Sequence, residues 1–218
     1  MATQTTNALP PIAGIVIAGG RSHRLGTDKR KLRLWGDAGP TLLEHTISIL
    51  RELCTEMIVV LNDPVDWQHL SVHPVRDRYA DAGVLGGIYS GLAAMSATHA
   101  MVVAADMPFL NRELLRAMMS LPRDYDVLVP RALQPDQTRN TPGLETLHAI
   151  YSATCLTTIQ TLLNQGNRRV TTVFSQVRTV ILEPNDLIPH DPLSFVNINT
   201  AEDLTTVQAY LKTKQNRT

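Results

Sequence analysis

A pair of glycines follows an apolar run near the start of the chain, and basic side chains come shortly afterwards. The stretch GIVIAGGRSHRLGTDK covers residues 14–29 and contains Arg21, Arg24 and Lys29. Glycines let a ligand approach the main chain closely, and exposed amides in such a turn form an anion-binding nest. Arg24 and Lys29 would add fixed positive charge, so the stretch predicts a triphosphate site. A tight glycine turn with solvated surface cations fits the same spacing, and both interpretations stay open here.

The spacing of this stretch excludes the common glycine-rich phosphate motifs. The dinucleotide fingerprint G-x-G-x-x-G is absent, because the chain reads G-G-x-x-x-x-x-G. A Walker loop needs Lys and then Ser or Thr after its last glycine, whereas Thr27 and Asp28 follow Gly26. Further along, GIYSGL lacks the G-x-S-x-G spacing of a hydrolase nucleophile. The stretch therefore combines a strand, glycine backbone and cations, and it matches none of these known motifs.

A carboxylate directly follows the apolar run AMVVAA, and this residue is Asp106. In open α/β sheets, ligands bind outside the carboxyl ends of the strands. Mg²⁺ prefers carboxylate oxygen together with substrate phosphates. We therefore predict that Asp106 binds Mg²⁺. The alternative, that Asp106 caps a helix over 108–121, is weaker because Asn111 is better placed for that role.

Three further polar residues are candidates for the same site. Asp77 precedes three glycines in VRDRYADAGVLGG, which could turn it toward a cleft, although a lone loop aspartate more often has a surface role. Asn197 and Asn199 lie two apart in an expected strand, so their side chains would point to the same face. Two amides on one face can read the edge of a polar ring. A turn-initiating asparagine pair is the alternative.

Histidine and cysteine spacing predicts neither a zinc site nor a disulfide scaffold. His69 and His73 are four apart, but Pro74 disfavours the helix that would bring them together. Cys54 and Cys155 are isolated and far apart, with no C-x-x-C pair. We expect both cysteines to lie in helices as small hydrophobic residues.

The elements that must position these residues alternate between strand and helix. Apolar runs predict strands at 12–18, 57–61, 73–76, 100–106 and 126–130, and helical spacing predicts helices at 41–53, 86–97 and 111–121. Thr41 and Glu44 form a capping box at the start of the first helix. Alternation at this pitch predicts βαβ units and a mostly parallel sheet.

The pattern changes in the last third of the chain. Residues 132–143 lack periodicity and predict a mobile loop. After it come LHAIY and TVILE, helices from about Ser152 to Gly166 and near 168–177, a last strand over 195–199, and a final helix capped by Thr200. We expect a single domain over 12–212, in which this part extends the same sheet, between flexible ends at 1–11 and 213–218.

Bulk composition restricts the class of partner. Lys plus Arg equal Asp plus Glu at 20 each, so nothing favours broad polyanion binding and no nucleic acid partner is expected. Apolar residues make up 44%, enough for a sizeable core. The start MATQTTNALPP lacks a signal-peptide pattern, and no run approaches membrane-spanning length. We therefore expect a cytoplasmic protein that makes no membrane contact.

Five segments, in the right order, resemble the motifs of the molybdenum cofactor guanylyltransferase family. They are IAGGRSHRLGTDK, RDRYADAGVLGGIYSGL, AADMPFL, LHAIYSATCLTTIQTLLNQGNRRV and FVNINTAEDL, and the match covers about residues 12–206. The resemblance implies an α/β, Rossmann-like fold of the nucleotidyltransferase type, with a mostly parallel sheet and helices on both faces. It also implies GMP transfer from GTP to molybdopterin, release of pyrophosphate and formation of molybdopterin guanine dinucleotide.

The resemblance also implies roles for individual residues and partners. Backbone of the glycine turn would hold the nucleotide, basic residues the phosphates, and polar residues the nucleotide, the metal and the pterin. The residues are Ile17, Ala18, Gly19 and Gly20 for backbone; Arg24 and Lys29 for phosphates; Asn62, Asp77 and Asp106 for the nucleotide; Asp106 for Mg²⁺; and Asn197 and Asn199 for the pterin. Molybdoenzyme-maturation proteins would be further partners.

Several positions depart from the family pattern. Val84 stands where proline is usual, and Lys31 stands where an apolar residue is usual. Glu145 and Thr146 precede LHAIY where the family more often has Q-P or R-P. The AGG form of the turn resembles guanylyl enzymes, whereas AAG resembles the related cytidylyl enzymes. Gly19 would leave more room for a purine edge near the backbone.

The implied chemistry is a Mg-dependent nucleotidyl transfer. A terminal phosphate of molybdopterin attacks the α-phosphorus of GTP, and pyrophosphate leaves without a covalent intermediate. Because the phosphate nucleophile is already ionised near neutral pH, no general base is needed. Two alternatives stay open: a cytidylyl- or sugar-nucleotidyltransferase on the same fold, and a non-catalytic nucleotide-binding protein that would not need Asp106.

Overall fold

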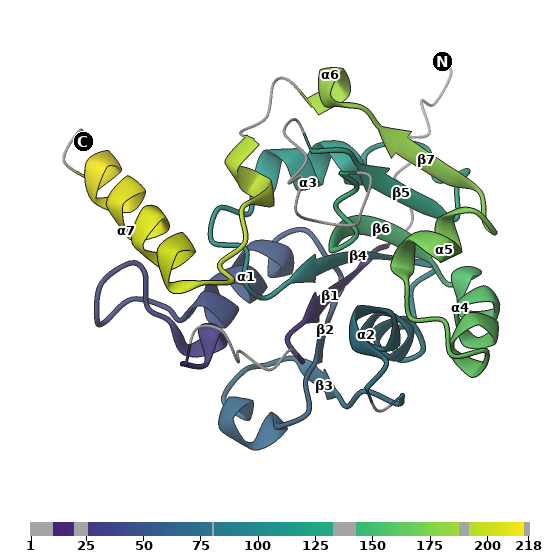
Figure 1. Ribbon diagram of the computed structural model, residues 1–218, viewed down its shortest axis with the longest axis horizontal. Helices are drawn as coiled ribbons and strands as arrows, with labels where there is room; N and C mark the ends of the chain where they lie inside the picture. The colour runs from purple at the N-terminus through teal and green to yellow at the C-terminus, as the bar shows by residue number, and fades with distance from the viewer. Residues whose placement is uncertain (1–10, 20–25, 80, 133–142, 188–191, 216–218) are drawn as a thin grey trace, which may run out of the picture.

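The computed structural model describes residues 11–19, 26–79, 81–132, 143–187 and 192–215. Within these residues, seven strands form one sheet in the order β3-β2-β1-β4-β6-β5-β7 (Figure 1). The strands are β1 Ala13–Ile17, β2 Glu56–Val60, β3 His73–Val75, β4 His99–Ala104, β5 Val127–Pro130, β6 His148–Ser152 and β7 Thr179–Leu182. Only β6 runs against its neighbours β4 and β5, so the predicted mostly parallel sheet is confirmed.

Helices cover both faces of the sheet, as the α/β prediction requires. They are α1 Leu42–Arg51, α2 Gly83–Leu92, α3 Arg112–Met119, α4 Cys155–Asn164, α5 Val170–Phe174, α6 Pro184–Leu187 and α7 Ala201–Gln215, with short 3₁₀ turns η1 Lys29–Lys31, η2 Pro64–Trp67 and η3 Pro192–Phe195. The helices α1 and α3 pack on one face, and α2, α4 and α5 pack on the other.

The strand β1 shows why a continuous apolar run marks the centre of this sheet. Successive side chains of a strand point to opposite faces, and here Ile15 enters the core under α2 while Val16 enters the core under α1. Both side chains are fully buried. A strand that is covered on both faces has no solvated side, so its apolar run has no polar alternation.

Side-chain caps start α1 and α3, the two helices on one face of the sheet. In α1, the Thr41 hydroxyl accepts from the backbone N–H of Glu44, and the Glu44 carboxylate accepts from the backbone N–H of Thr41, which confirms the predicted capping box. In α3, the Asn111 side chain accepts from the backbone N–H groups of Glu113 and Leu114, as predicted. These caps set the direction in which each helix leaves the loop before it.

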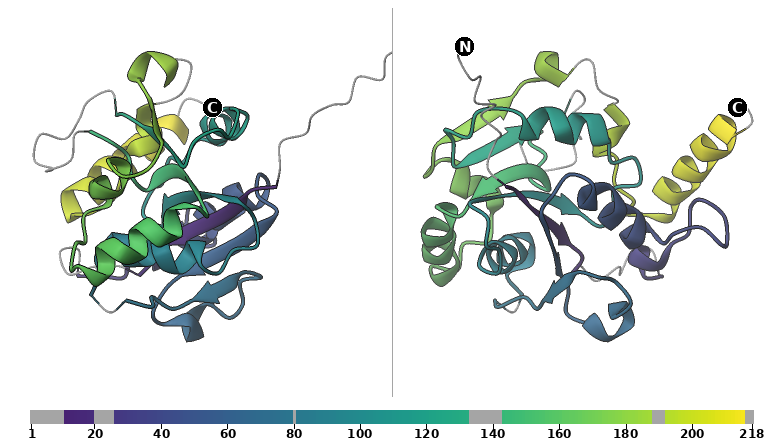
Figure 2. Two further views of the ribbon diagram at one scale, coloured as in Figure 1. Left: turned by 90° about the vertical axis from the view of Figure 1, so that its right-hand side faces the viewer. Right: turned by 180° about the vertical axis from the view of Figure 1, so that it is seen from behind.

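The helix α7 extends away from the sheet, which is clear from behind in Figure 2. Its buried Val207 packs with Leu34, Leu42 and Ile198 in a small separate cluster. The helix continues to Gln215, beyond the domain end expected at residue 212. No helix in the described part of the chain combines the length and apolar character needed to cross a bilayer.

The structure corrects the last predicted strand. Residues 196–199 carry no regular secondary structure, and Phe195 ends η3. Both edges of β4 are already paired, with β1 and β6, so this segment finds no open sheet edge there. Instead, the backbone N–H of Ile198 donates to the carbonyl of Asp106 at 3.0 Å.

The structure also shows where the two cysteines lie and which element the segment LHAIY forms. Cys54 follows the end of α1 rather than lying in a helix, because the chain turns there to enter β2. Cys155 is buried at the first position of α4, as expected for a small hydrophobic residue, and both thiols are free. The segment LHAIY supplies the single antiparallel strand, β6.

The topology brings the chemistry-bearing segments to one edge of the sheet. The last residues of β1, β2 and β4 are in register, since Ile17 pairs with Val60 on one side and with Ala104 on the other. The chain leaves β1 toward β2 and β3 and returns to β4 on the other side of β1, which makes a topological switch point between β1 and β4. Ligands of open α/β sheets bind outside such a point.

Candidate active site

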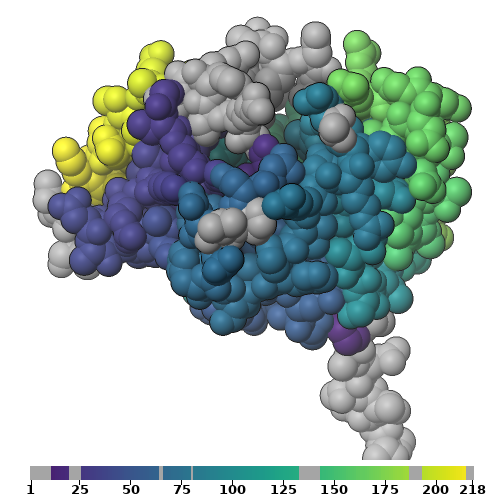
Figure 3. Space-filling view, turned by 90° about the horizontal axis from the view of Figure 1, so that it is seen from below, coloured from purple at the N-terminus to yellow at the C-terminus, as the bar shows by residue number. Residues whose placement is uncertain are grey.

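A cleft of 860 Å³ opens at the carboxyl ends of β1, β2 and β4. In Figure 3 the surface is hollowed where the purple, blue and teal segments meet. The lining includes nine of the eleven predicted site residues: Ile17, Ala18, Gly19, Lys29, Asn62, Asp77, Asp106, Asn197 and Asn199. The other two, Gly20 and Arg24, lie outside the described residues. A second cavity, of 530 Å³, lies between α3 and β7 and is lined by none of the predicted residues.

Lys29 joins three segments that are far apart in the sequence. Its Nζ atom lies 3.1 Å from Asp106 Oδ2 and donates a hydrogen bond of 2.9 Å to Asn199 Oδ1. The Lys29 side chain is 17% exposed and that of Asp106 is 24% exposed, and both residues line the cleft. The cation from the first crossover and the carboxylate after β4 therefore face each other.

The segment before α7 is fixed to this pair by its backbone and by a cap. Ile198 donates its N–H to the Asp106 carbonyl, as described above, and Asn199 N–H donates to Asp203 Oδ2 at 2.7 Å. Asp203 N–H in turn donates to the Thr200 hydroxyl, so Thr200 caps the helix as predicted. This cap holds Asn199 where its side chain meets Lys29.

Asn197 and Asn199 do different things, which corrects the prediction of a matched amide pair on one strand face. The Nδ2 group of Asn197 donates to the Phe195 carbonyl at 3.1 Å, whereas Asn199 accepts from Lys29. The predicted shared face required an extended strand, and this segment is a loop. Both residues still line the cleft.

Asp77 is held on the opposite wall of the cleft by α2. Its Oδ1 atom accepts from the backbone N–H of Tyr79 at 3.0 Å and lies 3.1 Å from the Ser90 hydroxyl. A Cβ at Gly86 would lie 3.0 Å from the same oxygen, so α2 approaches the carboxylate closely because residue 86 is glycine. Asp77 is thus an anchored cleft residue rather than a solvated loop aspartate. Sequence reasoning missed the fully buried Ser90, because a serine within a helix carries no distinctive signal.

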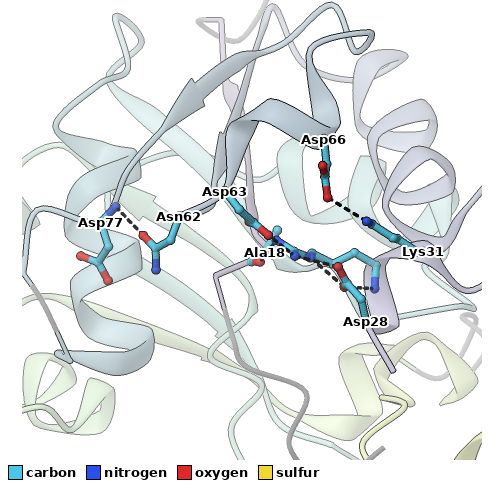
Figure 4. Close-up of polar contacts among 8 residues, drawn as sticks. Ala18, Asp28, Lys31, Asn62, Asp63, Asp66 and Asp77 are labelled. Carbon is cyan, nitrogen blue, oxygen red and sulfur yellow. Dashed lines mark hydrogen bonds and ion pairs between the residues drawn. The ribbon is translucent and has the colours of Figure 1, made fainter. Parts of the chain in front are cut away.

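Asn62 lies between Asp77 and Ala18, as Figure 4 shows. Its Oδ1 atom accepts from the Asp77 backbone N–H at 3.4 Å. A Cβ built on Gly19 would lie 3.9 Å from Asn62 Nδ2 and 3.8 Å from the Val60 carbonyl. That position is therefore uncrowded by protein, and the space above the Gly19 backbone belongs to the cleft.

The start of α2 adds backbone donors to the wall near Asp77, and no side chain of the described residues caps them. Ala82 occupies the N-cap position and supplies no side-chain acceptor. Gly83 has a positive φ of 63°, a conformation that glycine adopts without strain, and Gly83, Val84 and Gly87 line the cleft. The first amides of a helix lack intrahelical partners and carry partial positive charge, so this end favours an anion.

A network around Arg30 lies beside the pair of Lys29 and Asp106 and was not predicted. The Arg30 guanidinium hydrogen-bonds to Asp28 and Asp63 and donates to the Ala18 carbonyl at 3.2 Å. These bonds hold the pKa of both carboxyl groups below the usual range and raise the pKa of the guanidinium. Asp63 is 33 positions from Arg30, and nothing in either local sequence indicates the pairing.

Comparisons with known proteins identify a family model and relatives that match most of this chain. The family model described as "MobA-like NTP transferase domain" matches residues 14–180. A probable molybdenum cofactor guanylyltransferase of Chloroflexus aggregans is 42% identical over 93% of this chain and 96% of its own length. A molybdenum cofactor guanylyltransferase of Desulfosudis oleivorans is 30% identical over 92% of this chain and 96% of its own length.

Solved structures share the fold at lower identity. Molybdopterin-guanine dinucleotide biosynthesis protein A from Archaeoglobus fulgidus superposes with a TM-score of 0.73 at 22% identity, over 93% of this chain and 100% of that chain. A 2-C-methyl-D-erythritol 4-phosphate cytidylyltransferase from Thermus thermophilus gives 0.68 at 17%, over 93% and 99%. These two likenesses concern the fold alone. With the family model and the sequence relatives, the conclusion is that the chain belongs to the MobA-like NTP transferase family.

Proposed function

We propose that the chain transfers GMP from GTP to molybdopterin, releasing pyrophosphate and forming molybdopterin guanine dinucleotide. The names of the two sequence relatives, at 42% and 30% identity over nearly their whole length, support this substrate pair. The observation that carries the proposal is the meeting of Lys29, Asp106 and Asn199 at the switch point of the sheet. There, a cation and a carboxylate stand at the place where this class of sheet binds nucleotides.

The proposed nucleotide contacts follow the walls of the cleft. Backbone groups of residues 17–19 and the side chain of Asn62 would hold the nucleoside. Asp77 would contact the nucleotide from the wall formed by α2. Gly19 leaves room for a purine edge against the main chain, since a Cβ there would project into cleft space. On the other side, Asn197 and Asn199 would contact the pterin.

Mg²⁺ is part of the proposal, and the donor set of the cleft fits it. Within the described residues, no group of three or more His, Cys, Asp or Glu side chains is arranged to hold a metal alone. Mg²⁺ suits such a site, because it commonly binds through one or two carboxylates and completes its shell with substrate phosphates and water. Asp106 would hold it. When bound, Mg²⁺ neutralises phosphate charge and orients the reacting oxygens.

The chain's own residues act by positioning and by charge. Lys29 is held by Asp106 and Asn199, so its ammonium is already oriented toward the cleft. It would stabilise the negative charge that develops on the leaving pyrophosphate, together with Arg24. A donor that is fixed before the reaction costs little reorganisation in the transition state. The attacking phosphate is ionised near neutral pH, so the proposal needs no side chain as a general base.

Release of pyrophosphate tests the proposal. Purified protein is given molybdopterin and Mg²⁺ with GTP, CTP or ATP in separate reactions, and pyrophosphate is measured. We expect release with GTP well above CTP and ATP, and near-complete loss in Asp106→Asn. The variant Asp124→Asn is the matched control, because Asp124 is an exposed carboxylate beside the cavity between α3 and β7.

Each rival function has its own outcome in this assay. Preference for CTP would indicate a cytidylyltransferase. GTP binding without pyrophosphate release would indicate a non-catalytic nucleotide-binding protein. Full activity of Asp106→Asn would contradict the metal assignment. We also infer a cytoplasmic location, where GTP is available, and transfer of the product to molybdoenzyme-maturation proteins.

A further inference from the structure

The guanidinium of Arg30 uses all of its hydrogen-bond donors within the protein. Nε and Nη2 donate to the two oxygens of Asp28 at 2.8 and 2.7 Å, and Nη1 and Nη2 donate to the two oxygens of Asp63 at 2.6 Å each. Nη1 also donates to the Ala18 carbonyl at 3.2 Å. These bonds match the five N–H groups that a guanidinium possesses. The side chain is 14% exposed, and its Cζ lies 5.7 Å from the centre of the Trp67 ring.

This saturation decides what Arg30 can do in the cleft. Arg30 lines the cleft next to Lys29, so a direct contact with phosphate is the obvious role for it. Yet two carboxylates surround the single cation, and the group of Arg30, Asp28 and Asp63 carries a net negative charge. A guanidinium without a spare donor and with two counter-charges offers little attraction to a triphosphate. Arg30 is therefore better suited to hold protein segments than to bind the substrate.

The three partners of Arg30 belong to three segments that each carry a proposed nucleotide contact. Ala18 lies in the turn after β1, Asp28 directly precedes Lys29, and Asp63 directly follows Asn62. Figure 4 shows Ala18, Asp28 and Asp63 converging, with Asn62 next to Asp63 on the segment that follows β2. We propose that Arg30 is a positioning residue that sets the geometry of nucleotide binding by tying the glycine turn, η1 and the end of β2 together. This inference rests on the proposed nucleotide function of the cleft.

A neighbouring ion pair provides a matched control for this role. Lys31 Nζ lies 2.7 Å from Asp66 Oδ2, so this pair also connects η1 with η2. However, its side chains are 53% and 51% exposed, and among the described residues no hydrogen bond or ion pair joins it to the turn after β1. Exposed ion pairs of this kind contribute little to stability. The carboxylates of Asp63 and Asp66 are equally exposed, at 52% and 51%, and the two pairs span the same segments. The pairs differ in the tie to Ala18 and in the cation, which is 14% exposed in Arg30 and 53% exposed in Lys31.

Loss of the Arg30 hydrogen bonds, which we call the Arg30 brace, should weaken GTP binding. It lowers the fraction of molecules in which the three segments are correctly placed. The apparent affinity falls by that fraction. For Arg30→Ala we expect a dissociation constant for GTP that rises about tenfold or more, on the scale of a lost charge-assisted hydrogen bond. Arg30→Lys should not restore binding, because an ammonium cannot replace a planar guanidinium that donates hydrogen bonds to two carboxylates at once.

The decisive comparison is between Asp63→Asn and Asp66→Asn. If Arg30 braces the loops, Asp63→Asn weakens GTP binding in the same direction as Arg30→Ala, and the double variant is little worse than either single variant. If Arg30 instead binds phosphate directly, Asp63→Asn frees its charge and tightens GTP binding. Asp66→Asn should bind GTP within about twofold of the wild type under either model, as expected for an exposed pair.

Calorimetry with GTP, below the melting temperature of every variant, gives these affinities. Hydrogen exchange without nucleotide supplies an independent readout at the amides of Lys31 and Leu32, which donate to the carbonyls of Asp28 and Lys29. We expect faster exchange there in Arg30→Ala and Asp63→Asn, and wild-type exchange in Asp66→Asn. Tighter GTP binding by Asp63→Asn, or wild-type exchange in Arg30→Ala, would overturn the inference. If the wild type bound no GTP, the proposed function would fail while the exchange data still judged the brace.

Discussion

His148 lies beneath the segment that carries Asn197 and Asn199, and it makes stability depend on pH. The side chain of His148 is fully buried, and its ring meets the Phe195 ring at 4.9 Å in an edge-on contact. Among the described residues, neither ring nitrogen has a hydrogen-bond partner. Burial without a partner disfavours the charged form and lowers the pKa of His148 from 6.5 to about 3.

The sign and size of the effect follow from proton linkage. Between pH 6.5 and about 3, the unfolded chain holds a proton on this imidazole that the folded protein does not hold. The contribution of neutral His148 is therefore fully present above pH 6.5 and is lost as the pH falls toward 3. Each pH unit in this window removes about 1.4 kcal/mol from the free energy of unfolding. Between pH 7.5 and pH 5.0, the expected loss from His148 is about 2 kcal/mol.

Urea unfolding of the wild type and of His148→Leu at pH 7.5 and pH 5.0 measures this contribution. Leucine has a similar size and does not titrate, whereas His45, His99 and the carboxylates titrate in both proteins and cancel in the comparison. We expect the wild type to lose about 2 kcal/mol more than the variant between the two pH values. Equal losses in the two proteins would refute the reasoning, since His148 would then titrate alike in the folded and unfolded states.

The remaining predictions concern the cation of the cleft and the packing of α2. Lys29→Met should raise the dissociation constant for GTP about 10- to 100-fold in calorimetry, on the scale of hydrogen bonds to a charged group, with a smaller effect on stability; unchanged affinity would contradict the phosphate role. Gly91→Ala would place a Cβ 2.6 Å from Ile15 Cγ2, a fully buried branched side chain, and should lower the midpoint of urea unfolding. In the control Gly87→Ala, on the same helix face, the nearest atoms to the new Cβ are Ile17 Cγ2 at 3.4 Å and Ile17 Cδ1 at 3.5 Å, so this variant should leave the midpoint unchanged or raise it through better helix propensity. A drop of equal size in both variants would show that crowding of Ile15 is not the cause.

Local patterns were enough to predict the elements that build the cleft. The apolar runs that became β1, β2 and β4 are covered on both faces, so their sequences contain few polar interruptions. Asp106 follows such a run directly, and parallel strands bring their carboxyl ends to one edge. The meeting of Lys29 with Asp106 could therefore be expected from order along the chain and from the handedness of the fold.

The features that sequence reasoning missed depend on contacts between distant segments. The segment 196–199 has the composition of a strand, but both edges of β4 are occupied, and Ile198 hydrogen-bonds to the Asp106 carbonyl instead. The pairing of Arg30 with Asp63 joins residues 33 positions apart, and neither residue lies in a pattern that indicates a partner. Ser90 has no distinctive sequence pattern, and only the fold shows that it lies beside Asp77.

The most direct test of the account is a crystal structure of the protein with a non-hydrolysable GTP analogue and Mn²⁺, whose anomalous signal locates the divalent ion. The account predicts the triphosphate between the turn after β1 and Lys29, with Mn²⁺ coordinated by the Asp106 carboxylate and phosphate oxygens. A nucleotide bound outside this cleft, or a metal ion held by other residues while Asp106 keeps its ion pair with Lys29, would contradict it.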